Sequence, residues 1–302
     1  MTAAHLIKNK GPFNALVKTN KQTGKCFYRM DLEFEGQAAK AFAKTEPGQF
    51  AEFDLRQTSL PADEQIPNEL KDNCKRDILL RRPFSFCDVA TGGNKTTVEI
   101  LYCVVGPASL RMTTLKKGDK VNVIGPLGNG FSIPEEKKTA LLVAGGMGSP
   151  PLQHLAKYIS ENYPHIDVVV FAGAKTKEDF PFDPNKLTED KVEPIITTDD
   201  GSLGLKGLVT EHLEKQLERN KKFTNETIIY SCGPEEMLAK VAEIARKRKI
   251  DCQISMERRM ACGFGVCQGC AVECRGAGTK ETIYKMCCTD GPVFDSKELV
   301  FK

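Results

Sequence analysis

Short apolar runs, several of them alternating with polar residues, fill the first part of the chain. They occupy residues 13–18, 26–34, 49–55, 97–105 and 120–124. Such alternation is typical of half-buried strands. Because no long helical pattern separates these runs, they predict a closed antiparallel β-barrel over residues 1–135. The polar stretch at 56–75 has little periodicity, so we expect a surface insertion without chemistry there.

The pattern changes near residue 139. The runs at 139–144, 167–174, 194–198 and 227–231 are continuously apolar, which is typical of strands in a parallel sheet covered on both faces. Segments 152–160 and 235–249 instead have helical periodicity. We therefore predict an α+β multi-domain fold. It comprises the barrel, a parallel-sheet α/β domain over residues 136–250 and a small C-terminal domain over residues 251–302.

Composition narrows the function classes. The 302 residues are 40% hydrophobic and 27% charged, with a net charge of +3 and Lys and Glu interspersed, which argues against nucleic-acid binding. No apolar run approaches the roughly 20 residues that span a bilayer, so no membrane association is expected. The N-terminus lacks a basic region followed by an apolar core, which predicts a cytoplasmic protein. In a reducing cytosol, 12 cysteines indicate metal or redox chemistry rather than structural disulfides.

Three of these cysteines have a diagnostic spacing. Cys262, Cys267 and Cys270 follow the C-x4-C-x2-C pattern that binds one [2Fe-2S] cluster, with a fourth cysteine arriving from farther along the chain. The glycines between them allow the loop to curl closely around the irons. A structural zinc site is the alternative, but its short spacings are usually paired C-x2-C units, and only one is present here.

The fourth cluster ligand has three candidates. They are Cys288, Cys287 and Cys274. The segment Thr289-Asp290-Gly291-Pro292 provides a turn directly after Cys288, which favours that residue.

Two pieces of the predicted barrel can hold a flavin. The segment Arg81-Arg82-Pro83-Phe84-Ser85-Phe86 offers an arginine for a pyrophosphate and a strand edge for the isoalloxazine ring; an edge strand that begins at a proline is the alternative. The segment from Leu101 to Ser109 ends a strand in a turn of small residues, whose N–H groups and Ser109 hydroxyl can hold a phosphate. A plain β-turn is the alternative there.

The α/β part carries two turns at strand ends. Gly145-Gly146-Met147-Gly148 lies between a strand and a helix, which is the geometry that presents N–H groups to a pyrophosphate, although it is not a strict G-x-G-x-x-G. Cys232 follows the last of the apolar runs and precedes Gly233-Pro234, at the carboxyl end of a parallel strand where ligands bind. We therefore take Cys232 as the candidate catalytic residue, with a buried structural cysteine as the alternative.

These signals, in this order, resemble the ferredoxin reductase superfamily and, within it, the electron-transfer subunits of type B dihydroorotate dehydrogenase. The resemblance covers nearly the whole chain except residues 56–75. The segments that carry it are Arg82-Pro83-Phe84-Ser85, Leu101-Tyr102, Gly106 to Ser109, Gly125 to Gly130, Gly145 to Gly148, Asp199-Asp200-Gly201-Ser202, Cys232-Gly233-Pro234, Met256 to Gly263 and Cys288 to Phe294.

The resemblance implies FAD, a [2Fe-2S] cluster and NAD as cofactors of an oxidoreductase subunit. The family's fourth cluster ligand falls on Cys288, which leaves Cys287 as a spare thiol. Cys103 stands where relatives often carry an arginine. The implied cofactor-binding positions are Arg82, Pro83, Phe84, Ser85, Leu101, Tyr102, Cys103, Gly106, Ala108, Ser109, Gly145, Gly146, Gly148, Asp200, Gly233 and Pro234.

The resemblance also implies an electron path in pyrimidine biosynthesis. A partner catalytic subunit oxidises dihydroorotate at an FMN, and electrons pass through the cluster and FAD to NAD⁺, within an expected heterotetramer. An apolar surface around Phe264 and Val266 is the predicted docking site. NAD is preferred to NADP from the resemblance alone. Lys175 and Lys177, just after the second strand of the α/β part, can pair with a 2′-phosphate, which is the feature that would favour NADP. The alternatives are a reductase subunit of a hydrogenase, sulfite reductase or bifurcating ferredoxin–NADP complex, and, more remotely, a zinc-stabilised interaction module.

Overall fold

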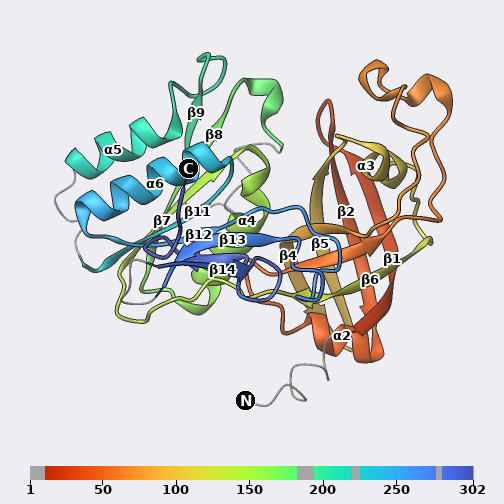
Figure 1. The fold of residues 1–302 in the computed structure, drawn as a ribbon, viewed down its shortest axis with the longest axis horizontal. Helices are drawn as coiled ribbons and strands as arrows, with labels where there is room; N and C mark the ends of the chain where they lie inside the picture. The colour runs from red at the N-terminus through yellow and green to blue at the C-terminus, as the bar shows by residue number, and fades with distance from the viewer. Residues whose placement is uncertain (1–10, 182–193, 220–224, 277–280, 302) are drawn as a thin grey trace.

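The computed structural model describes residues 11–181, 194–219, 225–276 and 281–301. Figure 1 shows a β-barrel beside an α/β sheet, with a short hairpin of the C-terminal segment lying against the sheet. Residues 1–10, on which we based the expectation of no signal peptide, lie outside the described part. Within that part, no helix is long and apolar enough to cross a membrane.

The barrel confirms the first prediction. Six antiparallel strands close in the order β1-β2-β5-β4-β3-β6. Their apolar side chains point inward, and Phe34, Phe42 and Phe86 are fully buried inside. The sequence did not predict α2 (Gly36–Phe42), which contributes the Phe42 ring stacked on Phe34 at a centroid distance of 3.9 Å. The strands are β1 (Gly11–Gln22), β2 (Phe27–Glu35), β3 (Phe50–Asp54), β4 (Arg82–Gly92), β5 (Lys95–Cys103) and β6 (Lys120–Leu127).

The polar stretch at 56–75 contains two short 3₁₀ turns, η1 (Asp63–Gln65) and η2 (Asn68–Leu70). Its buried residues Ile66 and Cys74 pack against Leu110 of α3 (Pro107–Met112). The segment that the sequence suggested was a turn therefore begins a helix. Pro107 fixes a helical first position, Ala108 and Met112 pack in the barrel core, and Leu110 packs under the insertion.

The second half is a seven-stranded sheet in the order β10-β9-β8-β7-β11-β12-β15, parallel except for β15. Helix α4 packs on one face, and α5 and α6 pack on the other. The strands are β7 (Thr139–Gly145), β8 (Asp167–Ala174), β9 (Ile195–Thr198), β10 (Leu205–Lys206), β11 (Thr227–Cys232), β12 (Asp251–Ser255) and β15 (Val293–Asp295). The helices are η3 (Gly146–Gly148), α4 (Ser149–Asn162), η4 (Lys177–Asp179), α5 (Val209–Arg219) and α6 (Glu235–Arg248).

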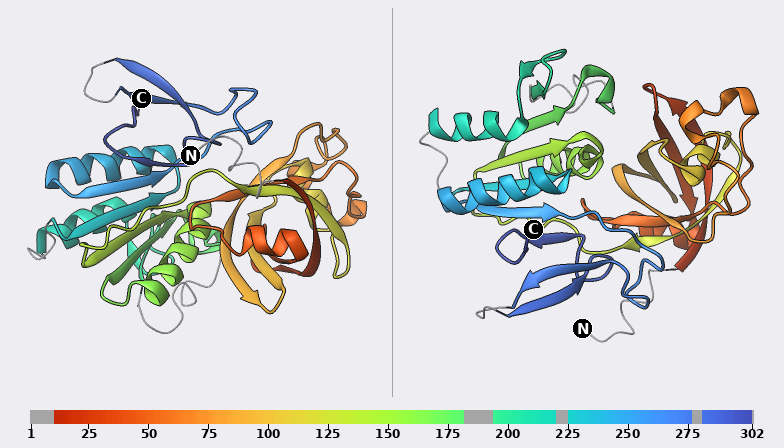
Figure 2. Two further views of the ribbon diagram at one scale, coloured as in Figure 1. Left: turned by 90° about the horizontal axis from the view of Figure 1, so that it is seen from below. Right: turned by 45° about the horizontal axis from the view of Figure 1, so that its top comes forward.

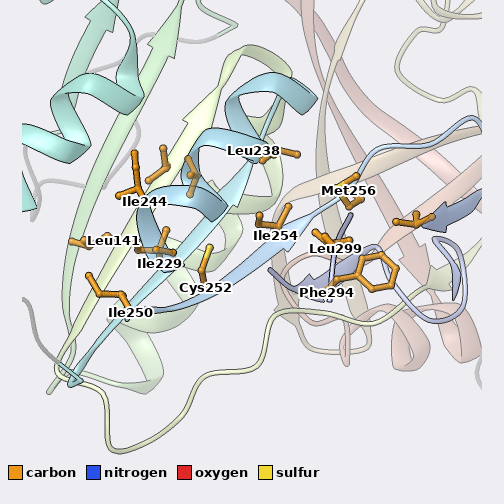
Figure 3. Packing of buried hydrophobic residues seen from close by; sticks show 14 of the residues in the cluster. Leu141, Ile229, Leu238, Ile244, Ile250, Cys252, Ile254, Met256, Phe294 and Leu299 are labelled. Carbon is orange, nitrogen blue, oxygen red and sulfur yellow. The ribbon is translucent and has the colours of Figure 1, made fainter. Parts of the chain in front are cut away.

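The C-terminal segment shares the core of this sheet. Strand β12 pairs with β11, and β15 pairs with β12, so the sheet continues beyond residue 250. Figure 3 shows Phe294 and Leu299 packed near Ile254 and Met256. The separate hairpin of β13 (Ala271–Arg275) and β14 (Thr282–Met286) lies against this core, as Figure 2 shows from two sides. The domain limits near residues 135 and 250 remain predictions.

Polar contacts fix the barrel against the sheet. Lys157 of α4 pairs with Asp88 of β4 at 2.8 Å, and Arg29 of β2 donates to Gln153 of α4 at 3.1 Å. On the other side, the Asn129 N–H donates to the Gly291 carbonyl at 2.7 Å. The sites below therefore lie between parts whose relative positions are held from both sides.

Candidate functional site

The structure places the four thiols of the predicted cluster site in two pairs, on the loop at residues 262–270 and on the turn at Cys288 that faces it. Cys270 and Cys288 form one close pair, with their Sγ atoms 3.3 Å apart. Cys262 and Cys267 form a second pair across a tight loop, where the Cys267 N–H donates to the Cys262 Sγ at 3.5 Å. In the described residues, no three His, Cys, Asp or Glu side chains gather as ligands of a single metal ion would.

Backbone N–H groups point at the sulfurs of this loop. Gly265 N–H donates to Cys288 Sγ at 3.1 Å, and Gly269 N–H donates to Cys267 Sγ at 3.5 Å. The loop turns this way because Gly263 and Gly265 have φ values of 77° and 86°, in the region that favours glycine. Four thiols with inward N–H donors fit a [2Fe-2S] cluster, whose potential depends on such hydrogen bonds.

The other two candidates for the fourth position point elsewhere. The Cys287 Sγ lies 3.2 Å from the Met256 carbonyl oxygen, to which it donates. Cys274 is fully buried in β13, opposite Ile283. The turn after Cys288 is closed by Asp290, whose carboxylate accepts from the Met286 N–H at 2.6 Å. This arrangement favours Cys288, and its role as a ligand remains a prediction.

The two thiols at opposite sides of the loop differ in acidity. Burial raises the pKa of Cys262, but the N–H groups of Cys267, Phe264 and Val266 bring it down to about 7. Burial and the neighbouring Cys270 raise the pKa of Cys288 to about 12. A bound cation would favour the thiolate at both positions, because a coordinating thiol loses its proton.

The loop at Gly125 to Gly130, which the resemblance included, clamps the turn after Cys288. Asn129 donates from its side chain to the Thr289 and Asp290 carbonyls at 3.0 and 3.1 Å. A Cβ atom at Gly128 would lie 2.5 Å from Pro292 Cδ, so only glycine allows this approach. The clamp positions Cys288 against the barrel.

The sequence analysis missed Glu52, which lies between the barrel and the cluster loop. A Cβ atom on Gly263 would lie 2.6 Å from Glu52 Cγ, so the loop packs directly on this side chain. Both Glu52 carboxylate oxygens are buried without a hydrogen-bond partner among the described residues. Burial raises the pKa of Glu52 to about 7, against the opposing charges of Arg81 and Arg82. A glutamate within the apolar run Phe50 to Phe53 was the available signal.

The first predicted flavin segment begins β4, next to this contact. Glu52 is the ladder partner of Pro83, and Ala51 is that of Phe84. The Arg82 guanidinium folds back onto the Leu80 and Arg81 carbonyls at 2.8 and 3.0 Å. Residues Arg82, Pro83, Phe84 and Ser85 are all partly exposed, so this strand edge is open to a ligand.

The second predicted flavin segment lies on the adjacent strand β5. Leu101 and Tyr102 are buried, and the Tyr102 hydroxyl donates to Asn20 at 3.0 Å. The Cys103 Sγ contacts Cys26. The Ser109 hydroxyl accepts from the Val105 and Gly106 N–H groups at 3.0 and 3.2 Å, so it stabilises the start of α3. Ala108 is buried in the same turn, and Gly106 has open space around it.

The glycine turn and the Cys232 turn meet at the switch point of the sheet. Strand β7 has β8 on one side and β11 on the other, and ligands bind beyond the carboxyl ends of strands at such a point. A Cβ atom on Gly148 would lie 2.1 Å from the Cys232 carbonyl oxygen, and one on Gly233 would lie 3.0 Å from the Gly145 nitrogen. Pro234 begins α6 beside Gly145, and Gly146 has open space beside it.

Orphaned polar groups lie beside this turn. The hydroxyl of Ser149, the first residue of α4, is buried without a partner in the described part of the chain. The same holds for the Gln153 amide nitrogen and for His154 Nδ1 one turn later. Burial lowers the pKa of His154 to about 4, so this imidazole is neutral at physiological pH. The unpaired Ser149 hydroxyl and the neighbouring glycine turn, which has no room for side chains at Gly145 and Gly148, fit a nucleotide pyrophosphate.

Cys232 and Asp200 occupy different places. Cys232 is buried at the end of β11, and burial raises the pKa of its thiol. Asp200 lies after β9, two strands from β7, where its carboxylate accepts from the N–H and hydroxyl of Ser202 at 3.0 and 2.6 Å. The Ser202 hydroxyl accepts from Lys177 N–H at 2.8 Å, so the Asp200 turn contacts η4, which follows β8, instead of the switch point.

Comparisons with known proteins identify two domains and the family of the chain. Residues 257–300 match the family model for the iron–sulfur cluster binding domain of dihydroorotate dehydrogenase B, and residues 142–243 match an oxidoreductase NAD-binding domain. The dihydroorotate dehydrogenase B (NAD(+)) electron transfer subunit of Caldanaerobacter subterraneus subsp. tengcongensis is 34% identical, with 95% of this chain and 98% of the relative aligned. The subunit of the same name from Bacillus velezensis is 33% identical, with 94% and 96% aligned.

Solved structures share the fold. A chain from the structure of the NADH-dependent reduced ferredoxin-NADP oxidoreductase, a system for flavin-based electron bifurcation, has a TM-score of 0.73 and 25% identity, and the match covers 95% of this chain and 90% of that one. The ferredoxin NADP⁺ reductase of Neisseria gonorrhoeae, solved with bound FAD and NADP, has a TM-score of 0.56 and 17% identity, with coverage of 78% and 91%.

Proposed function

We propose a function from the premise that this chain belongs to the family of electron transfer subunits of dihydroorotate dehydrogenase B (NAD(+)). The protein is a flavin and iron–sulfur oxidoreductase subunit that passes electrons from dihydroorotate oxidation to NAD⁺ in pyrimidine biosynthesis. The observation that carries the proposal is the contact between Gly263 of the cluster loop and Glu52, whose ladder partner Pro83 lies in the flavin segment. This contact supports a cluster and a flavin that are bound next to each other.

The chain's own residues bind and orient three groups. Cys262, Cys267, Cys270 and Cys288 hold the cluster, and the N–H groups of Gly265 and Gly269 stabilise the sulfur charge. The open edge of β4 and the end of β5 hold FAD. When bound, a flavin exchanges single electrons with an iron–sulfur cluster and electron pairs with nicotinamide.

The switch point of the sheet holds NAD. The first turn of this site has no side chains at Gly145, Gly146 and Gly148, so a pyrophosphate can approach its backbone closely. The facing turn is formed by Gly233 and Pro234. Cys232, the buried last residue of β11, would lie at the nicotinamide end of this site and is the proposed catalytic residue. Asp200 lies farther along the same sheet edge and contributes to the outer part of the nucleotide site.

The partner is a catalytic subunit that carries FMN, and the complex is a heterotetramer. Phe264 and Val266, with 51% and 74% of their surfaces exposed, lie within the cluster loop and form the docking surface. Exposed apolar residues beside a redox loop are typical of a surface that is covered by a partner. The 12 free cysteines need a reducing compartment, which favours the cytoplasm.

The three binding functions are divided among three units of the chain. Residues 1–135 bind FAD, residues 136–250 bind NAD, and residues 251–302 carry the cluster, with β12 and β15 joining the third unit to the sheet of the second. Such shared strands hold the cluster loop rigidly.

Co-expression with a candidate dihydroorotate dehydrogenase catalytic subunit tests the function. The purified complex should reduce NAD⁺ with dihydroorotate, and either subunit alone should not. Phe264→Asp should weaken complex formation about tenfold or more, because a charge in a desolvated contact costs at least about 1.4 kcal/mol. Leu208→Asp is the matched control, since Leu208 is also 51% exposed but lies before α5. If Phe264→Asp left complex formation unchanged, the proposed docking surface would be wrong. If the complex assembled but did not reduce NAD⁺ with dihydroorotate, the proposed function would be wrong.

A second function is favoured by the structural match at a TM-score of 0.73, namely a subunit of a bifurcating ferredoxin–NADP complex. Relatives of that kind can use an aspartate as a cluster ligand, whereas all four matching positions here are cysteines. Reduction of NAD⁺ by reduced ferredoxin, but not by dihydroorotate, would select this second function.

A further inference from the structure

Two cysteines of the barrel form a pair that the electron path does not use. Cys26 directly precedes β2, and Cys103 is the last residue of β5. Their Sγ atoms lie 3.1 Å apart, and both side chains are partly exposed and free. The backbone holds them in place, because Phe27 is the ladder partner of Cys103 and the Val104 N–H donates to the Cys26 carbonyl at 2.8 Å.

The remaining cysteines are either buried or placed in the cluster loop. Four are the predicted cluster ligands. Six others have buried side chains, so a reagent in solution cannot reach them: Cys74, Cys87, Cys232, Cys252, Cys274 and Cys287. Apart from the predicted cluster ligands, Cys26 and Cys103 are thus the two thiols that are both accessible and adjacent to each other.

We propose that Cys26 and Cys103 are a reversible dithiol–disulfide site that reacts with low-molecular-weight disulfides such as oxidised glutathione. A disulfide in a reducing compartment is usually transient and redox-sensing, which agrees with a pair that is accessible from solution. The inference does not depend on the identity of the electron donor or acceptor.

The reaction proceeds by two exchanges. The Cys26 thiolate attacks one sulfur of the small disulfide, which forms a mixed disulfide and releases one small thiolate. The Cys103 thiolate then attacks the Cys26 sulfur, which forms the Cys26–Cys103 bond and releases the second small thiolate. The two protein thiols lose two electrons and two protons in total, and the small disulfide gains them as two thiols.

The surroundings of the two thiols indicate which one attacks the small disulfide first. Burial, followed by the adjacent Cys26 thiol, raises the pKa of Cys103 to about 12, and the charge of Asp179 on η4 acts in the same direction. Cys103 is therefore disfavoured as the first nucleophile, and it acts second, where contact with Cys26 provides a high local concentration.

The new bond would join the start of β2 to the end of β5. Cys103 directly follows Tyr102, whose ring stacks on that of Tyr28 at a centroid distance of 5.4 Å. Since Tyr102 and Cys103 are both in the predicted flavin segment, oxidation acts at the edge of that site.

Trypsin gives a direct test, because each cysteine falls on its own peptide. Cleavage after Lys25 and Arg29 releases Cys26–Arg29, and cleavage after Lys95 and Arg111 releases Thr96–Arg111, which contains only Cys103. The anaerobically purified full chain is incubated with oxidised glutathione, blocked with an alkylating agent and digested. We expect the two peptides linked, with the mass of two hydrogens lost, and a return to two separate alkylated peptides after treatment with dithiothreitol.

Single variants separate the two steps. Cys103→Ser should trap glutathione on Cys26, whereas Cys26→Ser should leave Cys103 mostly alkylated. Cys74→Ser, at a buried thiol outside the pair, should leave the yield of linked peptide unchanged. The proposal is overturned if the wild-type chain gives only separate alkylated or glutathione-bound peptides, or if linked peptides join Cys26 to a cysteine other than Cys103.

Discussion

Glu52 should make the stability of the barrel depend on pH near neutrality. Its carboxylate oxygens have no partner in the described structure, and burial raises its pKa from 4.5 to about 7. Each pH unit between the two pKa values corresponds to about 1.36 kcal/mol, so the difference is worth about 3 kcal/mol.

The sign follows from proton binding. Because the folded protein binds this proton more tightly than the unfolded chain does, the contribution of Glu52 is fully present below pH 4.5. It is lost as the pH rises through about 7, where the buried carboxylate becomes charged. Glu52→Gln replaces the side chain with a neutral group of the same shape. The variant and the wild type should therefore be similarly stable near pH 4.5, and the variant should be more stable by up to about 3 kcal/mol above pH 7.

Guanidinium unfolding at a series of pH values, followed by circular dichroism under anaerobic conditions, measures this difference. Glu33→Gln is a control of opposite sign, because hydrogen bonds from Lys95 and Lys18 lower the pKa of Glu33. That variant should be less stable than wild type at neutral pH, and the deficit should fade as the pH falls through the folded pKa. A difference between Glu52→Gln and wild type that is equal at pH 5 and pH 8 would refute the reasoning.

Two further predictions concern the cluster and the nucleotide site. Cys288→Ser should lose most of the bound iron, measured colorimetrically per chain. Cys287→Ser should retain the iron, since the Cys287 thiol points at the Met256 carbonyl. The reverse result would identify Cys287 as the fourth ligand. Gly148→Ala should weaken NADH binding about tenfold or more, because its Cβ would overlap the Cys232 carbonyl and overpacking costs about 1–3 kcal/mol. Gly92→Ala, in open space at the end of β4, should bind NADH normally, and equal calorimetric affinities for the two variants would count against the site.

Local patterns in the sequence predicted most of the elements. Alternation identified five of the six barrel strands, whereas β4 was expected only from the strand edge at Arg82 to Ser85. Continuous apolar runs identified β7, β8, β9 and β11, because such runs are typical of strands buried on both faces. The short strands β12 and β15 were missed, since each has few residues and becomes a strand only by pairing with a distant partner. Helix α2 was missed because its seven residues are too few for a clear helical period.

In the candidate site, too, features set by local sequence could be predicted and features set by long-range contacts could not. The spacing of Cys262, Cys267 and Cys270 is local, so the sequence alone indicates a cluster loop. The pair of Cys26 and Cys103 is separated by 77 positions and becomes visible only when β2 pairs with β5. No pattern along the chain reports a contact of that kind.

The contact between Glu52 and Gly263 depends on three separate parts of the chain. The Gly125 to Gly130 loop holds the turn after Cys288, the sheet holds β12 before the cluster loop, and the barrel presents β3. Each part is specified by its own residues, but the distance between the thiols and the flavin strand is set only when all three are assembled. We therefore expect electron transfer between the two predicted sites to depend on Asn129 and Gly128, which sequence patterns alone identify as an ordinary tight turn.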